Sequence, residues 1–371
     1  MKLIPLASPN ITDKAIDSVV SVLRSGMLVQ GKFVNQLEYD ICSYLDVSYC
    51  AAVSNGTASL HLALVTLGLG PEDEVILPAL SYTATANVVE LVGATPIFVD
   101  VNQDFTINVL LIEEKVTDKT KVIMPVHEFG IAADMDAILN IAERHNLWVL
   151  EDAACALGSK YKGRYCGTLG DFGSFSLHPR KAITSGEGGL VVTNNAIFDK
   201  KVRILRNHGI EPEVQPMEFS EAGFNYRLTD FQSALVLDQL ASLDDIIAKR
   251  NDLAAIYYQE LKSDHFRLPI VPNYAFSNWQ TFQIVLNDQK TRNSLKDHLL
   301  KNNIQSNYGA QCIPEVKFFK NKYQLDSSNK FPNAFEAYNQ GLAIPLYEKL
   351  TEEDINYISD CVNDFFKRNG E

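Results

Sequence analysis

The first half of the chain alternates short apolar runs with amphipathic segments, and this alternation limits the possible folds more than any other feature. Helices are expected at residues 57–67 and in TATANVVELVG and DMDAILNIAERHN, and strands in DEVILPAL, ATPIFVDVN, KVIMPVHEFG and NLWVLEDAA. Strands and helices joined by short Gly, Pro and Asp turns indicate βαβ units and a mostly parallel sheet. Such sheets bind ligands beyond the carboxyl ends of their strands, so we expect the chemistry at that edge.

The second half is strongly helical from about residue 228 to residue 262 and then breaks at a Pro-rich segment, residues 268–272. A strand in WQTFQIVLND, a helix near residues 292–302, a loop and a final helix over 351–367 are expected to follow. A length of 371 residues is compatible with about two domains. We predict a large domain, residues 1–245, whose N-terminal segment is free to pack on the other domain, and a smaller α+β domain, residues 246–371.

Charge and cysteine usage exclude several classes of function. With 33 Lys and Arg against 46 Asp and Glu, the net charge is −13, and the chain contains no basic run. Nucleic-acid binding is therefore not expected. The six cysteines form no Cys-x-x-Cys pair and no zinc spacing, which is typical of reduced thiols and predicts no metal site. Without a signal-like opening or a run of about 20 apolar residues, we expect a cytoplasmic protein that does not enter a membrane.

Two segments at the predicted ligand-binding edge carry polar groups. SNGTASLHLAL places Asn55, Gly56 and Thr57 directly before a helix, whose free N–H groups suit a phosphate; an ordinary helix cap is the alternative. Glu151 and Asp152 end a buried strand. An acid there could hold a protonated ring nitrogen, bind a metal ion or cap the next helix, although no second carboxylate or His stands at metal spacing.

The stretch GDFGSFSLHPRKAITSGEGGLVVTNN places Lys181 in a turn flanked by glycines. A deprotonated lysine is a carbonyl nucleophile that forms Schiff bases, whereas most lysines are simply solvated.

Tyr82 follows a strand end and could stack on a flat ligand or rim the core. Asn225 and Arg227 precede a helix that begins near Thr229, which they could cap. A phosphate at a helix start, an acid for a ring nitrogen, an aromatic cover and a Schiff-base lysine together describe pyridoxal 5′-phosphate (PLP).

Ordered motifs along nearly the whole chain resemble the DegT/DnrJ/EryC1/StrS family of sugar aminotransferases. They are IPLASPNITDKAIDSVVSVLRSGMLVQG, SNGTASLHLAL, PEDEVILPALSYTATANVVELVGATPIFVDV, PVHEFGIAADMDAI, EDAACALGSKYKGRYCGTLGDFGSFSLHPRKAITSGEGG, GFNYRLTDFQSA and LAIPLYEKLTEED. The resemblance implies the α/β aspartate-aminotransferase fold (fold type I of PLP enzymes), with a large, mostly parallel-sheet domain and a smaller C-terminal α+β domain.

The resemblance also implies a role for individual residues. Lys181 matches the lysine that forms the Schiff base with PLP, and Asp152 matches the acid that pairs with the pyridine nitrogen. Tyr82 falls where an aromatic residue stacks on the ring. The remaining matches concern the cofactor's phosphate: Gly56, Thr57 and Ser176 bind it within one subunit, and Asn225 reaches it from the neighbouring subunit. This last match implies a homodimer with shared active sites.

The chain departs from the family pattern at two places. Cys155 stands where many members carry Gln or His near the cofactor's phenolic oxygen, and a thiol is a weaker hydrogen-bond donor. In the C-terminal part, Asn307 and Tyr308 replace a His-Tyr or His-Phe segment near the nucleotide sugar. The sugar dehydratases, a related branch, carry histidine in place of the lysine, so Lys181 argues against that branch.

The resemblance implies transfer of an amino group from L-glutamate, which leaves as 2-oxoglutarate, to a nucleotide-linked 4-keto-6-deoxyhexose. The IPLASPNI opening favours C4 over C3. Products of this kind enter O-antigen, other lipopolysaccharide or surface glycans, or antibiotics. The alternatives are a 3-keto nucleotide-sugar or keto-cyclitol aminotransferase and a non-catalytic regulator with the PLP fold. A nicotinamide-dependent dehydrogenase would need a Gly-x-Gly-x-x-Gly after the first strand, which is missing.

Overall fold

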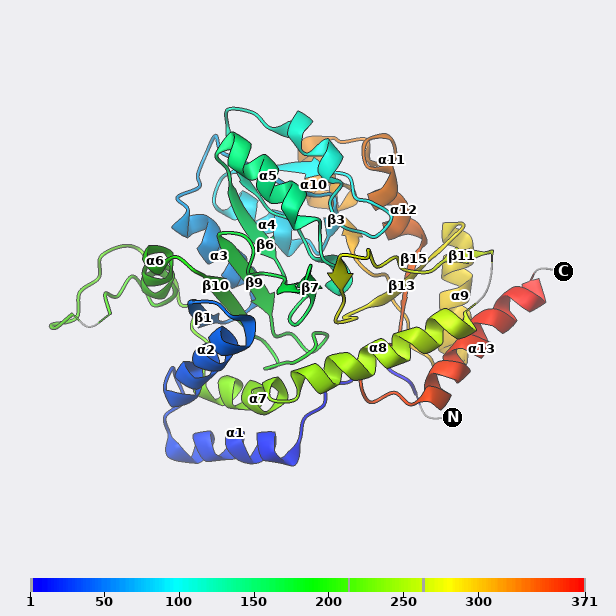
Figure 1. Cartoon of the computed structure of the whole chain (residues 1–371), viewed down its shortest axis with the longest axis horizontal. Helices are drawn as coiled ribbons and strands as arrows, with labels where there is room; N and C mark the ends of the chain where they lie inside the picture. Colours follow the sequence, from blue (N-terminus) through cyan, green and yellow to red (C-terminus); the bar gives the residue numbers. More distant parts are fainter. Residues whose placement is uncertain (1–2, 213, 262–263, 370–371) are drawn as a thin grey trace.

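A seven-stranded sheet forms the centre of the computed structural model, which describes residues 3–212, 214–261 and 264–369 (Figure 1). Four neighbouring pairs are parallel, and β10 is antiparallel to both of its neighbours. Val- and Ile-rich strands are typical of a sheet covered on both faces. In spatial order the strands are β1 (Tyr49–Val53), β10 (Gly189–Thr193), β9 (Phe172–Ser176), β6 (Trp148–Asp152), β5 (Thr120–Ile123), β2 (Glu74–Pro78) and β4 (Thr95–Val99).

Helices cover both faces of this sheet and bury one apolar cluster on each. One cluster contains side chains of α2 (Lys32–Leu45), α5 (Met135–His145), α7 (Asp230–Leu240) and the start of α8 (Leu243–Glu260). The other contains side chains of α3 (Gly56–Thr66), α4 (Ala84–Leu91), α6 (Ala196–Arg206), α10 (Lys317–Tyr323) and α12 (Pro332–Gln340). The helix α1 (Asp13–Ser25) lies outside these layers, against α7 (Figure 1).

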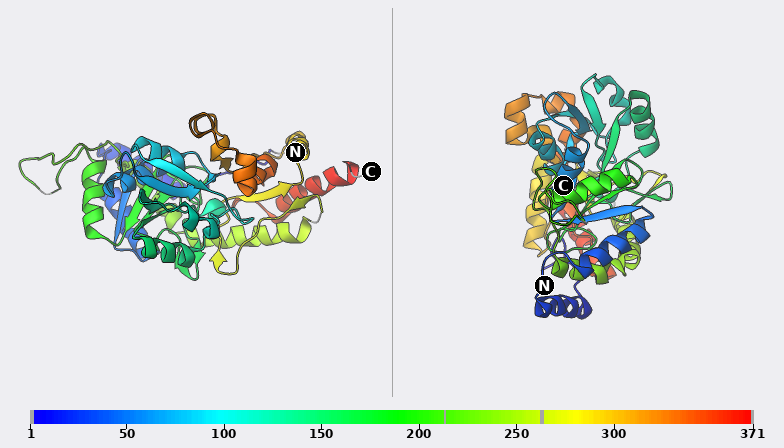
Figure 2. Two further views of the ribbon diagram at one scale, coloured as in Figure 1. Left: turned by 90° about the horizontal axis from the view of Figure 1, so that it is seen from above. Right: turned by 90° about the vertical axis from the view of Figure 1, so that its left-hand side faces the viewer.

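A third apolar cluster lies at the end of the molecule away from α6 (Figure 2). A three-stranded antiparallel sheet, β11 (Phe266–Arg267), β13 (Phe282–Leu286) and β15 (Gly341–Ile344), packs there with α9 (Gln289–Lys301), α13 (Glu352–Asn369) and the second half of α8. Ile4 joins this cluster, and its backbone pairs with Asn303 and Gln305. The N-terminal segment therefore packs on C-terminal elements. The division into a domain of residues 1–245 and a domain of residues 246–371 stays a proposal, and α8 crosses this boundary.

Short elements complete the described chain. They are β3 (Leu80–Ser81), β7 (Lys160–Tyr161), β8 (Arg164–Tyr165), β12 (Ala275–Phe276), β14 (Gln311–Cys312) and α11 (Ser327–Lys330), with the 3₁₀ turns η1 (Val109–Leu111), η2 (Glu113–Lys115), η3 (Glu128–Gly130) and η4 (Ile313–Glu315). Among the described helices, none is both long and apolar enough to cross a lipid bilayer.

Three sequence-based expectations were wrong in detail. The strand expected over residues 121–130 ends at Ile123, because Pro125 has no N–H for the ladder and the chain then turns into η3. The helix expected from about residue 228 is two helices, since α7 packs on α1 and α2 whereas α8 packs on α13. The loop expected after α9 contains β14, η4, α10, α11, α12 and β15, which are too short to leave a clear periodic pattern.

Candidate active site

A cavity of about 640 Å³ opens at the carboxyl ends of the central parallel strands, where the sequence predicts the chemistry. Its volume lies within the range of ligand and cofactor sites, roughly 300–1,000 Å³. Elements from both halves of the chain form its wall. All but one of the predicted site residues line it: Gly56, Thr57, Tyr82, Asp152, Cys155, Ser176 and Lys181.

The N-terminus of α3 forms one wall of the cavity. Asn55 caps the helix, since its side chain accepts a hydrogen bond from the N–H of Ala58 at 2.8 Å. The first N–H groups of a helix have no partner within it, and Gly56 and Thr57 line the cavity. The helix cap is therefore present, and it does not exclude an anion at the same helix start. A Cβ on Gly56 would lie 3.0 Å from the Cβ of Ser176, so Gly56 keeps β9 and α3 close together.

The two acids at the end of β6 point to opposite sides, as successive residues of a strand do. Glu151 is fully buried and accepts hydrogen bonds from the N–H groups of Gly167, Leu169 and Gly170 at 2.6–2.7 Å. His127 accepts the N–H of Ala133 at Nδ1, so its Nε2 carries the proton that it donates to Glu151 at 2.8 Å. Glu151 is thus structural, and it holds the strand end that presents its neighbour to the cavity.

Asp152 is the acid that lines the cavity. Its Oδ2 accepts the hydroxyl of Thr85 at 2.8 Å, and its Oδ1 accepts the N–H of Ala154 at 3.2 Å. Burial raises the pKa of this carboxyl, and the two hydrogen bonds oppose the rise. A buried carboxylate of this kind gains stability from a cationic partner, such as a protonated ring nitrogen.

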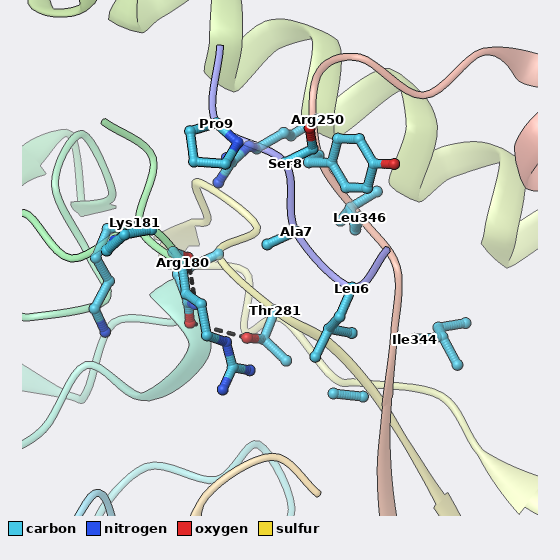
Figure 3. Close-up of a pocket in the computed structure, with 14 residues that line it drawn as sticks. Leu6, Ala7, Ser8, Pro9, Arg180, Lys181, Arg250, Thr281, Ile344 and Leu346 are labelled. Carbon is cyan, nitrogen blue, oxygen red and sulfur yellow. Dashed lines mark hydrogen bonds between the residues drawn. The ribbon is translucent and has the colours of Figure 1, made fainter. Parts of the chain in front are cut away.

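Lys181 follows β9 in a turn closed by a hydrogen bond from its own N–H to the carbonyl of His178, at 2.9 Å. The adjacent carbonyl of Arg180 accepts the side-chain amide of Gln280 at 2.9 Å, which ties this turn to the segment before β13. Figure 3 shows a small neighbouring cavity, where Arg180 extends toward Thr281 and Lys181 extends away from the N-terminal segment. Its volume of about 20 Å³ suffices for about one water molecule.

The Lys181 ammonium donates a hydrogen bond to the Cys155 sulfur at 3.1 Å. Burial raises the pKa of this thiol, and the positive charge of Lys181 opposes the rise. Cys155 thus contacts the predicted Schiff-base nitrogen directly, a contact that its place in the sequence does not reveal. Tyr82 also lines the cavity, but its side chain is 68% exposed, so it forms the rim and is free to cover a flat ligand.

Asn225 is the one predicted site residue outside the cavity lining. It is exposed and lies at the base of an arm formed by residues 207–212 and 214–225, which leaves the body of the molecule at the left of Figure 1. Bridges between Asn207 and Asn225 and between Ile210 and Phe219 hold the arm together. Met217 and Phe219 on this arm are 60% and 63% exposed.

Sequence reasoning missed three polar residues of the wall. Thr85 holds Asp152, and Glu128 is a second buried carboxyl group in the cavity. Gln311 follows the Asn307–Tyr308 segment, and its amide oxygen makes no hydrogen bond within the described part of the chain. These residues come from α4, η3 and β14, so only the folded chain brings them together. Among the described residues, no group of three or more His, Cys, Asp or Glu side chains is placed to hold a metal ion.

The groups of the cavity suit PLP. The start of α3 with Ser176 offers donors for a phosphate, Asp152 offers a buried negative charge, and Lys181 offers the amine for a carbonyl. These elements are spread around one cavity of sufficient volume. The fold and the site therefore define a PLP-dependent enzyme.

Comparison with known proteins specifies the class further. Residues 9–363 match the DegT/DnrJ/EryC1/StrS aminotransferase family, and the chain belongs to this family. It is 36% identical over 368 residues to a GDP-perosamine synthase of Escherichia coli O157:H7, covering 99% of each chain. It is 42% identical over 260 residues to a GDP-perosamine synthase of Caulobacter vibrioides, covering 70% of each chain.

A solved structure agrees over the whole chain. Spr1654 from Streptococcus pneumoniae, described as a sugar aminotransferase, superposes in its PMP-form with a TM-score of 0.94, at 29% identity and 100% coverage of both chains. Its PLP-form superposes with a TM-score of 0.93, at 30% identity and 99% coverage of both chains. The predictions of the family, the fold, the cofactor and the enzyme class are confirmed: the chain is a PLP-dependent sugar aminotransferase.

Proposed function

We propose that the enzyme transfers an amino group from L-glutamate to C4 of a nucleotide-linked 4-keto-6-deoxyhexose. The observation that carries this proposal is the full-length similarity to a GDP-perosamine synthase, an enzyme named for a 4-amino sugar. A second GDP-perosamine synthase, with 42% identity over 260 residues, supports it. GDP-linked sugars are therefore the first candidates.

The proposed roles follow from the positions of the side chains. PLP, when bound, supplies the electron sink for a carbanion. Asp152 keeps the proton on the ring nitrogen, and the start of α3 with Ser176 binds the phosphate. Lys181 carries the reacting amine and, once released, moves a proton between the α-carbon of the donor and C4′ of the cofactor. Gln280 holds the turn that carries Lys181 in place through the carbonyl of Arg180.

The segment before and in β14 is the proposed wall for the sugar. Gly309, Ala310 and Gln311 line the cavity, and Gln311 has a free amide oxygen within the described chain. Tyr308 does not line the cavity, and the Arg292 guanidinium packs over its ring at 4.1 Å. We infer that this segment contacts the sugar through Gln311 and the adjacent backbone rather than through an aromatic side chain.

The test is an absorbance measurement on the PLP-loaded protein. Adding L-glutamate should bleach the visible band as the cofactor takes up the amino group. The bleached protein is then offered GDP-, TDP- and UDP-linked 4-keto-6-deoxyhexoses, and we expect a GDP-linked one to restore the band. Each is paired with the matching 3-keto sugar as a control.

Three outcomes would contradict the proposal. Restoration by 3-keto sugars alone would favour the 3-keto or cyclitol alternative. A visible band unaffected by L-glutamate would refute this amino donor, and a protein that transfers no amino group to any acceptor would favour a regulator.

We further propose a homodimer in which Asn225 serves the active site of the neighbouring subunit. The support is that Asn225 is exposed at the base of the projecting arm, that it does not line the cavity of its own chain, and that the arm carries exposed apolar side chains. The proposed setting is the cytoplasm, and the proposed product enters O-antigen or another lipopolysaccharide or surface glycan.

Mixing two variants with different defects tests the shared site. A hydrogen bond to a charged group contributes about 1.5–3 kcal/mol, so Asn225→Ala should weaken PLP binding roughly 10- to 100-fold. Refolded together with Lys181→Ala subunits at limiting PLP, it should regain about a quarter of wild-type activity, because half the dimers then hold one intact site. If Asn225 serves its own subunit, mixing restores nothing.

A further inference from the structure

Glu128 is a buried carboxyl group in the cavity that the roles above leave unused. It begins η3, directly after the segment that follows β5, and its side chain is 4% exposed. The backbone that follows it makes a tight turn, in which Phe129 and Gly130 have φ values of 57° and 88°. A Cβ on Gly130 would lie 2.0 Å from Oδ1 of Asn278, so this turn accepts only glycine there.

Four of the other polar groups that line this cavity interact with Glu128. Lys181 lies in the turn after β9, Asp152 ends β6, Cys155 follows β6, and Ser81 belongs to β3. Together with Glu128 itself, the set contains one cation, two carboxyl groups, a thiol and a hydroxyl. Ser81 is 2.8 Å from the hydroxyl of Thr85, which in turn donates to Asp152.

Burial raises the pKa of Glu128 to about 7, and the negative charge of Asp152 adds to the rise. The positive charge of Lys181 and the hydroxyl of Ser81 oppose it. The carboxyl group is therefore able to change charge near neutral pH, in the cavity that also holds the lysine nitrogen.

We propose that Glu128 is a positioning residue for Lys181 that acts through its charge. The ionised carboxylate stabilises a proton on the lysine nitrogen, both as the free amine and in the Schiff base with PLP. When the carboxyl group is neutral, the lysine nitrogen releases that proton more readily. This inference rests on the proposed role of Lys181 and adds a second carboxyl group, separate from Asp152, that controls it.

The experiment is a pH titration of the visible absorbance of the PLP-loaded protein, which reports protonation of the Schiff-base nitrogen without turnover. Glu128→Gln keeps the shape of the side chain and removes its charge. An opposite charge close by shifts such an equilibrium by about 1–3 pH units. We expect the midpoint of the variant to move to lower pH by about one unit, because the protonated form loses its nearby anion.

Three companion variants separate charge from structure. Glu128→Ala removes the same charge without placing an amide near Ser81, so it should shift the midpoint alike. Glu128→Asp keeps the charge and should restore most of the wild-type midpoint. Asp104→Asn removes another buried carboxyl group whose pKa is raised by burial, but outside the cavity, and should leave the midpoint unchanged.

The outcomes distinguish the role of Glu128 from the proposed function of the enzyme. If Glu128→Gln or Glu128→Ala binds PLP and titrates like the wild type, the inference is overturned while the proposed function stands. An equal shift in Asp104→Asn would also overturn it, because the effect would not belong to the cavity. If the wild-type protein forms no Schiff base with PLP, the role of Lys181 itself is refuted.

Discussion

Lys181→Ala is expected to lower the rate of transamination at least about 1,000-fold, because it removes both the Schiff-base amine and the group that moves the proton. PLP should remain bound noncovalently, since the start of α3, Ser176 and Asp152 still line the cavity. Steady-state assays and the half-reaction with L-glutamate measure the loss. Borohydride reduction followed by intact mass should find covalent cofactor on the wild type and none on the variant.

A matched control is Lys121→Ala, which removes an exposed lysine at the start of β5. It should keep wild-type rates and the covalent label. Substantial turnover by the Lys181 variant, or a label that persists on another lysine, would refute the assignment of Lys181.

Asp152→Asn is expected to slow transamination about 100-fold or more while the fold stays intact. A nearby opposite charge in a buried site changes a proton equilibrium by about 1–3 pKa units, each equal to 1.36 kcal/mol. The neutral amide cannot hold the proton on the ring nitrogen in this way. Its single amide oxygen can still accept the N–H of Ala154 or the hydroxyl of Thr85, and its size is nearly that of the carboxylate, so the fold should stay intact. Single-turnover rates with L-glutamate measure the loss, and circular dichroism with thermal unfolding checks the fold.

Asp136→Asn provides the comparison, because it neutralises an exposed carboxylate on α5 that pairs with Lys162. Its rate should equal that of the wild type. Near-normal turnover by the Asp152 variant would mean that this acid does not act on the ring nitrogen.

The strand–helix order could be predicted because parallel strands and amphipathic helices differ in period and are separated by turn residues. The breaks in that order were harder to predict. Nothing in the Ala241–Ser242 pair marks the end of α7, which ends where its packing partners change. The short helices after β14 are equally hidden, because packing on the large sheet rather than local periodicity defines them.

Some residues of the candidate site could be predicted from the sequence, and others could not. Lys181 and Asp152 stand out because rare motifs surround them. The neighbouring Glu151 is an equally plausible acid in the sequence. In the folded strand the two side chains point to opposite sides, so Glu151 enters a buried hydrogen-bond network and Asp152 lines the cavity.

The sequence alone determined the family, the cofactor and the edge of the sheet where the chemistry occurs, since these depend on motifs and periods that are local in the chain. The tertiary structure decided which side chains surround the lysine nitrogen. Cys155 follows β6 and contacts that nitrogen, Glu128 of η3 lines the same cavity, and Thr85 of α4 holds Asp152. This set of side chains exists only once β6, η3 and α4 pack together. Charge acts over distances in space rather than along the chain, and therefore the control of protonation at Lys181 is a property of the folded protein.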